Sequence, residues 1–270
     1  MRYITLVLIV FALSIQVSTA QSVRGVVLDS QTGEPVAYAN IGVPNKKHGT
    51  VANAQGQYEL SVSNKHLKDT IQIASVGYKT NYVLGSRLIK TPKILLEPDV
   101  IELDEVTVNI KQLKEKTIGN KTKSKSLRGG FKNATLGHEI GAIFRTGKKE
   151  TFVKSLNTNI VSNTNKSMKF RLNFYSVKKG LPDEKLVFKN IIFTIDAAEG
   201  PFSLDLTSYD ILLKKDFFCT MELVENQNPD ESIFFSAGLF GNKLVYRETS
   251  HATWDKIKVL GIGFNLTVAR

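Results

Sequence analysis

Apolar and polar residues alternate with a period of two along much of this chain. Residues 57–62 place Tyr, Leu and Val at every second position, with polar residues between them. Residues 168–175 repeat the pattern over eight positions, and residues 217–224 follow it less cleanly. A period of two is typical of strands that have one face in a core and one in water. The pattern therefore predicts an all-β protein.

The strand-like segments fall into two groups, the first within residues 21–110. Short strands separated by turn residues are typical of a small sandwich, so we predict a seven-stranded β-sandwich here. No stretch of this group has a helical period. Its strands are expected at 22–28, 36–43, 57–62, 70–76, 78–84, 93–96 and 106–110.

The second group lies within residues 134–270 and predicts a second antiparallel β-sandwich, jelly-roll-like in form. Pro182, Pro201 and Pro229 fall between its strands, where a missing N–H does no harm. The strands are expected at 168–175, 186–195, 202–206, 217–224, 233–237, 243–247 and 261–269.

The net charge of +11 is concentrated between the two groups. Residues 111–133 hold eight Lys or Arg and one acidic residue, which predicts an extended basic linker, since like charges repel. Its lysines are either a solvated spacer or a contact to an anionic membrane surface. Neither group carries a strong basic excess, so we exclude nucleic acid as a partner.

Residues 1–20 are typical of a secretory signal peptide. Arg2 supplies a positive charge, residues 4–15 are an uncharged apolar run, and Ser18-Thr19-Ala20 places small residues before a cleavage site at Gln21. An uncleaved membrane anchor is the alternative, but the run is short for a spanning helix. We therefore expect an exported protein. Cys219 is the only cysteine, so an intramolecular disulfide is excluded.

Ordered motifs in residues 22–109 resemble the carboxypeptidase regulatory-like domain, which is transthyretin-like in fold. They are residues 23–29, 32–36, 39–41, 49–50, 56–60 and 76–78, and residues 103–108 resemble the segment that ends such domains in outer-membrane receptors. Gly33 and Gly56 fall where tight turns need a positive φ.

The resemblance implies a Gram-negative cell envelope, where such domains stand at the N-terminus of TonB-dependent receptors. A receptor barrel would need hundreds more residues, so we expect a stand-alone relative in the periplasm or at the outer membrane. Its expected partner is an envelope protein or a polysaccharide.

The histidines do not have the His-x-x-Glu spacing of the zinc peptidases that give the domain its name. His66-x-x-Asp69 is the nearest approach, and a catalytic zinc needs three rigid protein ligands. His138 and Glu139 are adjacent, so in a strand they point to opposite faces. We therefore predict no catalytic residue, no metal site and no cofactor, and the ligand-binding residues are unknown.

Two further residues could have either a structural or a functional role. Cys219 lies in an apolar strand, which favours a buried thiol over a nucleophile. Trp254, beside Tyr246 and near His251, favours packing over stacking on a sugar ring. One residue of each pair Phe217-Phe218 and Phe234-Phe235 is expected inside.

These observations predict a non-enzymatic binding or interaction protein of the cell envelope. A carbohydrate-binding accessory protein of outer-membrane nutrient uptake is the first alternative, and a concave aromatic face on residues 134–270 would favour it. A hydrolase with its site in the second domain is the other, and a cleft with a catalytic pair would favour that.

Overall fold

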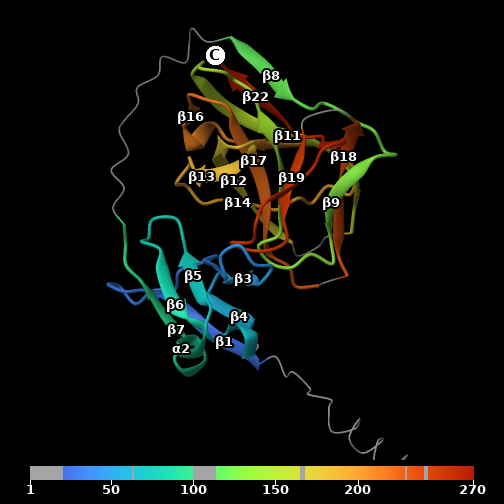
Figure 1. Cartoon of the computed structure of the whole chain (residues 1–270). Helices are drawn as coiled ribbons and strands as arrows, with labels where there is room; N and C mark the ends of the chain where they lie inside the picture. The colour runs from blue at the N-terminus through green and yellow to red at the C-terminus, as the bar shows by residue number, and fades with distance from the viewer. Residues whose placement is uncertain (1–20, 63, 100–113, 165–167, 229, 240–242) are drawn as a thin grey trace, which may run out of the picture.

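The computed structural model describes residues 21–62, 64–99, 114–164, 168–228, 230–239 and 243–270. In this part of the chain, small N-terminal sheets lie beside two curled antiparallel half-barrel sheets that form a second β domain (Figure 1), which confirms the predicted all-β class. No helix within these ranges is long and apolar enough to cross a membrane. The helical elements are α2 (Gly85–Lys90) and the 3-10 helices η1 (Asn64–His66) and η3 (Thr207–Tyr209).

The N-terminal strands pair into a three-stranded sheet, in the order β4-β1-β7, and a four-stranded sheet, in the order β3-β2-β5-β6. The alternation of residues 57–62 is confirmed, because every second side chain of β4 is buried. Gly33 and Gly56 have φ of +73° and +70°. Strand β3 was not predicted, and the strand predicted at 106–110 lies outside the described residues. The strands are β1 (Gln21–Asp29), β2 (Asn40–Gly42), β3 (Gly49–Val51), β4 (Gln57–Val62), β5 (Thr70–Ala74), β6 (Asn81–Leu84) and β7 (Lys93–Leu96).

The first half-barrel sheet has the order β13-β12-β17-β10-β19-β20, with β14 paired to β12. Of the predicted strand 186–195, only residues 191–193 are a strand. The strands are β10 (Glu139–Phe144), β12 (Lys169–Lys178), β13 (Leu181–Lys185), β14 (Ile191–Phe193), β17 (Phe217–Glu225), β19 (Leu244–Arg247) and β20 (Asp255–Ile257).

The second half-barrel sheet has the order β21-β18-β11-β22-β8, with β15 and β16 paired to β11 and β9 paired to β18. The long strand β11 was not predicted, and the strand predicted at 261–269 is two strands. The strands are β8 (Glu115–Gly119), β9 (Arg128–Lys132), β11 (Thr151–Asn163), β15 (Gly200–Asp205), β16 (Ile211–Leu213), β18 (Ser232–Leu239), β21 (Leu260–Ile262) and β22 (Asn265–Ala269).

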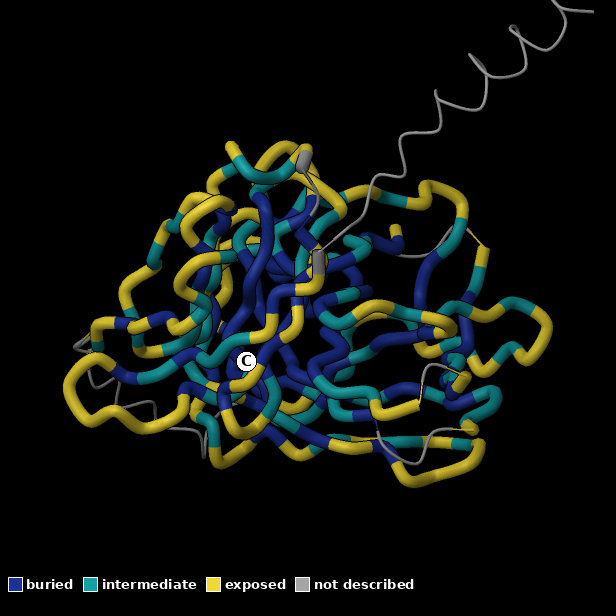
Figure 2. Tube along the Cα trace, turned by 90° about the horizontal axis from the view of Figure 1, so that it is seen from below, coloured by how far each residue is buried: buried dark blue, intermediate teal, exposed yellow. Residues whose placement is uncertain are grey.

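Each part has its own hydrophobic core, visible as the dark-blue interior runs of Figure 2. Val27, Ile41 and Ile71 are completely buried in the N-terminal core. The larger core of the second domain lies between the two half-barrel sheets and includes Phe170 and Phe235. Because these cores share no residue, each part buries its own apolar surface.

The prediction of an extended basic linker over residues 111–133 is wrong for residues 114–132. Strand β8 pairs with β22, and β9 pairs with β18, so both belong to the second domain. Phe131 is fully buried in the main core, and Ile118 packs against that core. The charges do not prevent this arrangement, because lysines on edge strands keep their ammonium groups in water while the backbone pairs.

Candidate functional site

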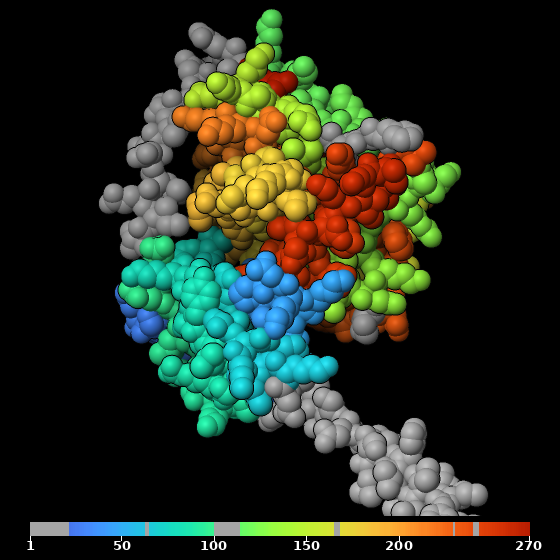
Figure 3. Space-filling view, viewed as in Figure 1, coloured from blue at the N-terminus to red at the C-terminus, as the bar shows by residue number. Residues whose placement is uncertain are grey.

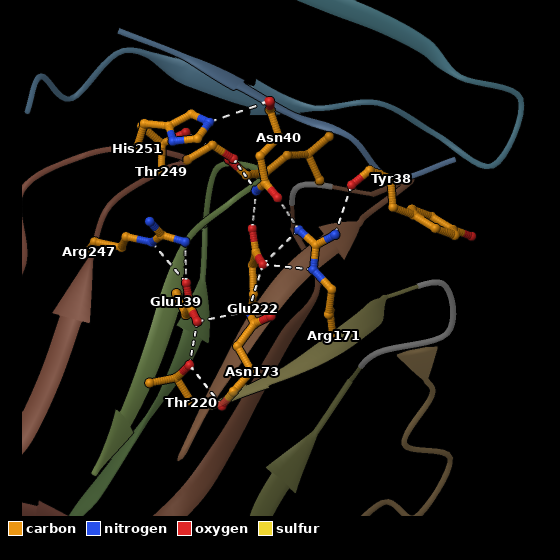
Figure 4. Close-up of polar contacts among 12 residues, drawn as sticks. Tyr38, Asn40, Glu139, Arg171, Asn173, Thr220, Glu222, Arg247, Thr249 and His251 are labelled. Carbon is orange, nitrogen blue, oxygen red and sulfur yellow. Dashed lines mark hydrogen bonds and ion pairs between the residues drawn. The ribbon is translucent and has the colours of Figure 1, made fainter. Parts of the chain in front are cut away.

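A row of charged side chains crosses the outer face of the first half-barrel sheet. Antiparallel register places Arg247 opposite Glu139, Glu139 opposite Glu222, and Glu222 opposite Arg171. These four residues come from β19, β10, β17 and β12, which are neighbours in the sheet. The row therefore has two carboxylates in the middle and one guanidinium at each end (Figure 4).

The ion pair of Arg171 and Glu222 is completely buried. Both residues have a relative exposure of 0%. The Nε and Nη2 atoms of Arg171 donate to one oxygen of Glu222 at 3.0 and 2.8 Å. A buried pair stabilises a fold only when hydrogen bonds satisfy its remaining polar atoms, because both charges have lost their hydration. The contacts of the neighbouring residues meet this condition.

Glu139, the second buried carboxylate, is bound in the same way. Arg247 contacts it through Nε at 2.8 Å and through Nη2 at 2.6 Å. The amide of Asn173 donates to Glu139 and to Glu222, at 2.9 Å each, and so bridges two like charges. The hydroxyl of Thr220 also donates to Glu139. Polar side chains of the neighbouring row thus hold the two carboxylates together.

The N-terminal part covers this row and completes it. Asn40 of β2 donates its amide to Glu222 and accepts from Arg171 through its amide oxygen. The backbone carbonyl of Tyr38, a residue with φ of +55°, accepts from Nη1 of Arg171 at 2.9 Å. Arg171 and Glu222 of the charged row are therefore contact residues between the two parts of the chain, and Figure 4 shows Asn40 of β2 and Tyr38 of the preceding turn approaching them.

A second contact lies beside the row, at the segment that follows β19. Gly42 and Gly49 face each other across β2 and β3. A Cβ atom on either would lie 2.5 or 2.6 Å from the backbone oxygen of Ser250, so only glycine allows this approach. The backbone N–H of Asn45 donates to the carbonyl of His251 at 2.9 Å. Figure 3 shows the blue N-terminal residues seated against the red residues of this segment.

The charges of the row are set by their neighbours. Burial would raise the pKa of Glu222, but Arg171, Arg247 and Lys185 lower it to about 2. Glu222 is therefore ionised at neutral pH. Burial also raises the pKa of the Tyr175 hydroxyl, which lies next to Glu139.

His251 makes the junction sensitive to acid. Burial, followed by the charge of Arg247, lowers its pKa from 6.5 to about 4. Since the unfolded chain takes up this proton more readily than the folded one, stability falls as the pH drops from about 6.5 to about 4. Asparagine is a suitable replacement for His251, because it tolerates the φ of +60° at this position and its side chain does not titrate.

Between pH 6.5 and pH 4 we expect the His251→Asn protein to lose about 2–3 kcal/mol less stability than the parent protein. Urea unfolding at several pH values measures this loss, and the difference between the two proteins at pH 7.5 gives the pH-independent cost of the substitution. Parallel pH profiles for the two proteins would show that another group causes the acid sensitivity.

The row is poorly arranged for catalysis, although it contains two neighbouring carboxylates. Both oxygens of each carboxylate already accept hydrogen bonds from the protein. The N-terminal part closes the face from which a substrate would enter. General acid–base work needs a group within reach of a substrate proton. Three clefts of the described surface are lined by other residues.

One such cleft, of about 470 Å³, lies at the same junction. It runs between β3 and β4 on one side and residues 134–136 of the second domain on the other, and Lys47 and Glu248 pair across it. A larger and shallower hollow of about 800 Å³ adjoins it along β4. Both place mixed charges and backbone groups at the surface.

The residues that the sequence offered for metal binding contact other side chains in the structure. The ring of His66 stacks on His48 at 3.9 Å, and Asp69 accepts from Lys46 at 2.8 Å. In the described ranges no three His, Cys, Asp or Glu side chains form a group that could hold a metal ion. His138 packs against Phe131 of the main core, whereas Glu139 lies in the charged row, as residues on opposite faces of a strand do.

The remaining candidates are packing residues. Cys219 is buried, and burial raises the pKa of its thiol, as the apolar strand predicted. The guanidinium of Arg247 lies 4.8 Å from the ring centre of Trp254, so this ring face is occupied. Of the phenylalanine pairs, Phe235 is the buried member of its pair, but Phe217 and Phe218 are both buried, because β17 has a core on each face.

Sequence reasoning missed the charged row. The alternation of residues 168–175 predicted that Arg171 and Asn173 face water, whereas both are buried beneath the N-terminal part. Glu222 interrupts the apolar run of β17, and a charge at such a position is rarely buried without a partner. That signal was available, but the partner is fixed by strand register.

Comparisons with known proteins identify the N-terminal part. The family profile described as CarboxypepD_reg-like domain matches residues 23–108, which confirms the resemblance drawn from the motifs. No curated protein matches the chain. Among solved structures, the cysteine protease and lectin-like domains of Cwp84, a surface layer associated protein of Clostridium difficile, match with 11% identity and a TM-score of 0.42. The alignment covers 82% of this chain and 46% of that one.

Proposed function

We propose that this chain, whose residues 23–108 are a CarboxypepD_reg-like domain, is an exported, non-enzymatic binding protein of the cell envelope. The regulatory-like domain and the second β domain act as one rigid unit that presents a binding surface. As finer proposals, the N-terminal sheets are a transthyretin-like sandwich and the second domain is jelly-roll-like. The partner is an envelope protein or a polysaccharide.

The closed charged row is the observation that carries this proposal. Glu139, Glu222, Arg171 and Arg247 are the residues best suited to chemistry, and each is bound to other residues of the protein. Arg171 and Glu222 also bind Tyr38 and Asn40 and so join the two parts. Domains of one chain usually move relative to one another unless their interface is extensive. A junction of buried charges that hydrogen-bond to both parts supports a scaffold that holds a surface in place, as a binding protein requires.

Export is tested by the mass of the mature protein. Because Ser18-Thr19-Ala20 fits a signal-peptidase site, we expect the protein in the envelope fraction to begin at Gln21. Intact-mass spectrometry of that fraction measures the N-terminus directly. A protein that stays in the cytoplasm and keeps Met1 would contradict the proposed location.

The binding function is tested by capture from envelope extract. The immobilised mature protein should retain an envelope protein or a polysaccharide, identified by mass spectrometry or sugar analysis, and a heat-unfolded sample of the same protein is the control. The retained component should be recovered intact after prolonged incubation. If the folded protein, but not the heat-unfolded control, releases shortened products, the protein is a hydrolase and the proposed binding function is wrong.

A further inference from the structure

The outer face of the second half-barrel sheet is lined by amides and hydroxyls. Register places Asn157 of β11 between Asn265 of β22 and Ser203 of β15. The next row places Thr267 between Thr117 of β8 and Ser155 of β11. Four neighbouring strands thus present two adjacent rows of Asn, Ser and Thr, and the second row continues from Ser155 to Asp205 of β15.

The chain that follows β8 turns this flat face into a groove. Between β8 and β9 the green segment of Figure 1 passes in front of the sheet edge, and Thr122 lies against Gly263 and Gly238 of the sheet. The groove has a volume of about 330 Å³, which falls in the range of small-molecule sites. Lys121 and Lys123 stand on one wall, and Asn159 and Ser203 stand on the other.

Several polar groups of the groove are left for a ligand. Asn159 donates its amide to Ser236 at 2.9 Å, and Asn265 donates to the carbonyl of Asn157 at 3.2 Å. The amide oxygens of Asn159 and Asn265 accept no hydrogen bond from another residue in the described ranges. They are acceptors for hydroxyl donors, and nearby hydroxyls of the protein can accept in turn.

The charge of the groove is positive. Lys121 and Lys123 have no carboxylate partner among the described residues, whereas Lys125 pairs with Glu199 at 3.2 Å. No carboxylate of the described residues lines the groove. A cleft that carries one sign of charge concentrates ligands of the opposite sign.

We propose that this groove binds an acidic glycan. The sugar hydroxyls bond to Asn159, Asn265 and the hydroxyl row, and the carboxylate or sulfate of the sugar pairs with Lys121 and Lys123. This inference rests on the proposed binding function and names its ligand class. The basic run that predicted a linker thereby becomes part of a site, because folding sets its lysines beside a row of amides.

Binding is measured by affinity electrophoresis and calorimetry with three soluble polymers: polygalacturonate, dextran sulfate and neutral dextran. The intact mature protein should bind one or both acidic polymers and leave neutral dextran unbound, and the two acidic arms tell a carboxylate from a sulfate. The paired variant Lys121→Glu/Lys123→Glu should weaken this binding by about tenfold or more, because two attractions become repulsions.

A matched control has the same change of charge elsewhere. Lys148→Glu/Lys149→Glu alters two exposed lysines that do not line the groove and should stay within about twofold of the unaltered protein. Asn159→Asp is nearly isosteric. It should also weaken the binding of acidic polymers, and its melting temperature should stay close to that of the parent.

Three results would overturn the inference. The first is an affinity for neutral dextran equal to that for the acidic polymers. The second is an equal loss of affinity in the Lys121/Lys123 variant and the Lys148/Lys149 variant. The third is binding to phosphatidylglycerol vesicles without binding to any acidic polymer. If no glycan binds while the envelope capture still retains a protein, the glycan site is wrong and the proposed binding function stands.

Discussion

Arg171→Ala should lower the free energy of unfolding by about 3–5 kcal/mol. The substitution leaves the carboxylate of Glu222, at 0% exposure, without its main partner in a region that water does not reach. It also removes the donor to the carbonyl of Tyr38 and the partner of the Asn40 amide. An uncompensated buried charge costs far more than the loss of an exposed pair. Urea unfolding of the mature protein measures the change.

Two further variants separate the buried pair from a general effect of charge. Arg24→Ala breaks the exposed pair with Glu59, whose side chains are 79% and 54% exposed, and should cost less than about 1 kcal/mol. Arg171→Met combined with Glu222→Leu removes both charges and should cost less than Arg171→Ala alone. If Arg171→Ala were as mild as Arg24→Ala, water would reach the row and the junction would be open.

Gly130→Ala should cost about 3 kcal/mol, although it lies within the run that the sequence marks as a basic linker. A Cβ atom at this position would lie 2.0 Å from the backbone oxygen of Ile233 and 2.8 Å from the Cα atom of Phe234. These are atoms of strand β18, with which β9 pairs, so they cannot rotate away as a side chain can. Relief requires the two strands to separate, and thermal or urea unfolding measures the loss.

The neighbouring glycine provides the control on the same strand. A Cβ atom at Gly129 would meet only the end carbons of Ile262 and Leu244, at 3.2 and 3.3 Å, which can move by a few tenths of an ångström. Gly129→Ala should therefore stay within about 1 kcal/mol of the parent. Equal and small effects at both glycines would mean that residues 128–132 are not packed against β18 in solution.

Local sequence patterns were sufficient to predict several strands, one buried side chain and the turn glycines. The alternation of residues 57–62 and 168–175 predicted strands β4 and β12, and the apolar run around Cys219 predicted a buried thiol. Glycines in turn clusters, such as Gly33, predicted a positive φ because other residues are strained there. The ordered motifs of residues 22–109 predicted the regulatory-like domain, which the family profile matches at residues 23–108.

Strand β11 was missed because its polar residues belong to the groove and not to a simple solvent face. Asn157 and Asn159 interrupt the apolar pattern, and a sequence pattern cannot tell an amide ladder from a loop. Residues 114–132 were missed for a related reason. Their lysines are typical of a linker, whereas pairing with β18 and β22 depends on two strands more than a hundred residues away.

The amino-acid sequence was sufficient to predict the β class, the positions of many strands, the buried thiol and the family of the first domain, because these depend on residues that are neighbours along the chain. The burial and pairing of the charged residues depend on the three-dimensional fold. Arg171, Glu222 and Glu139 are distant in sequence, and strand register brings them into one row. Whether that row meets water or Asn40 depends on how the two parts pack, since a charged side chain is stable in either setting once it has partners.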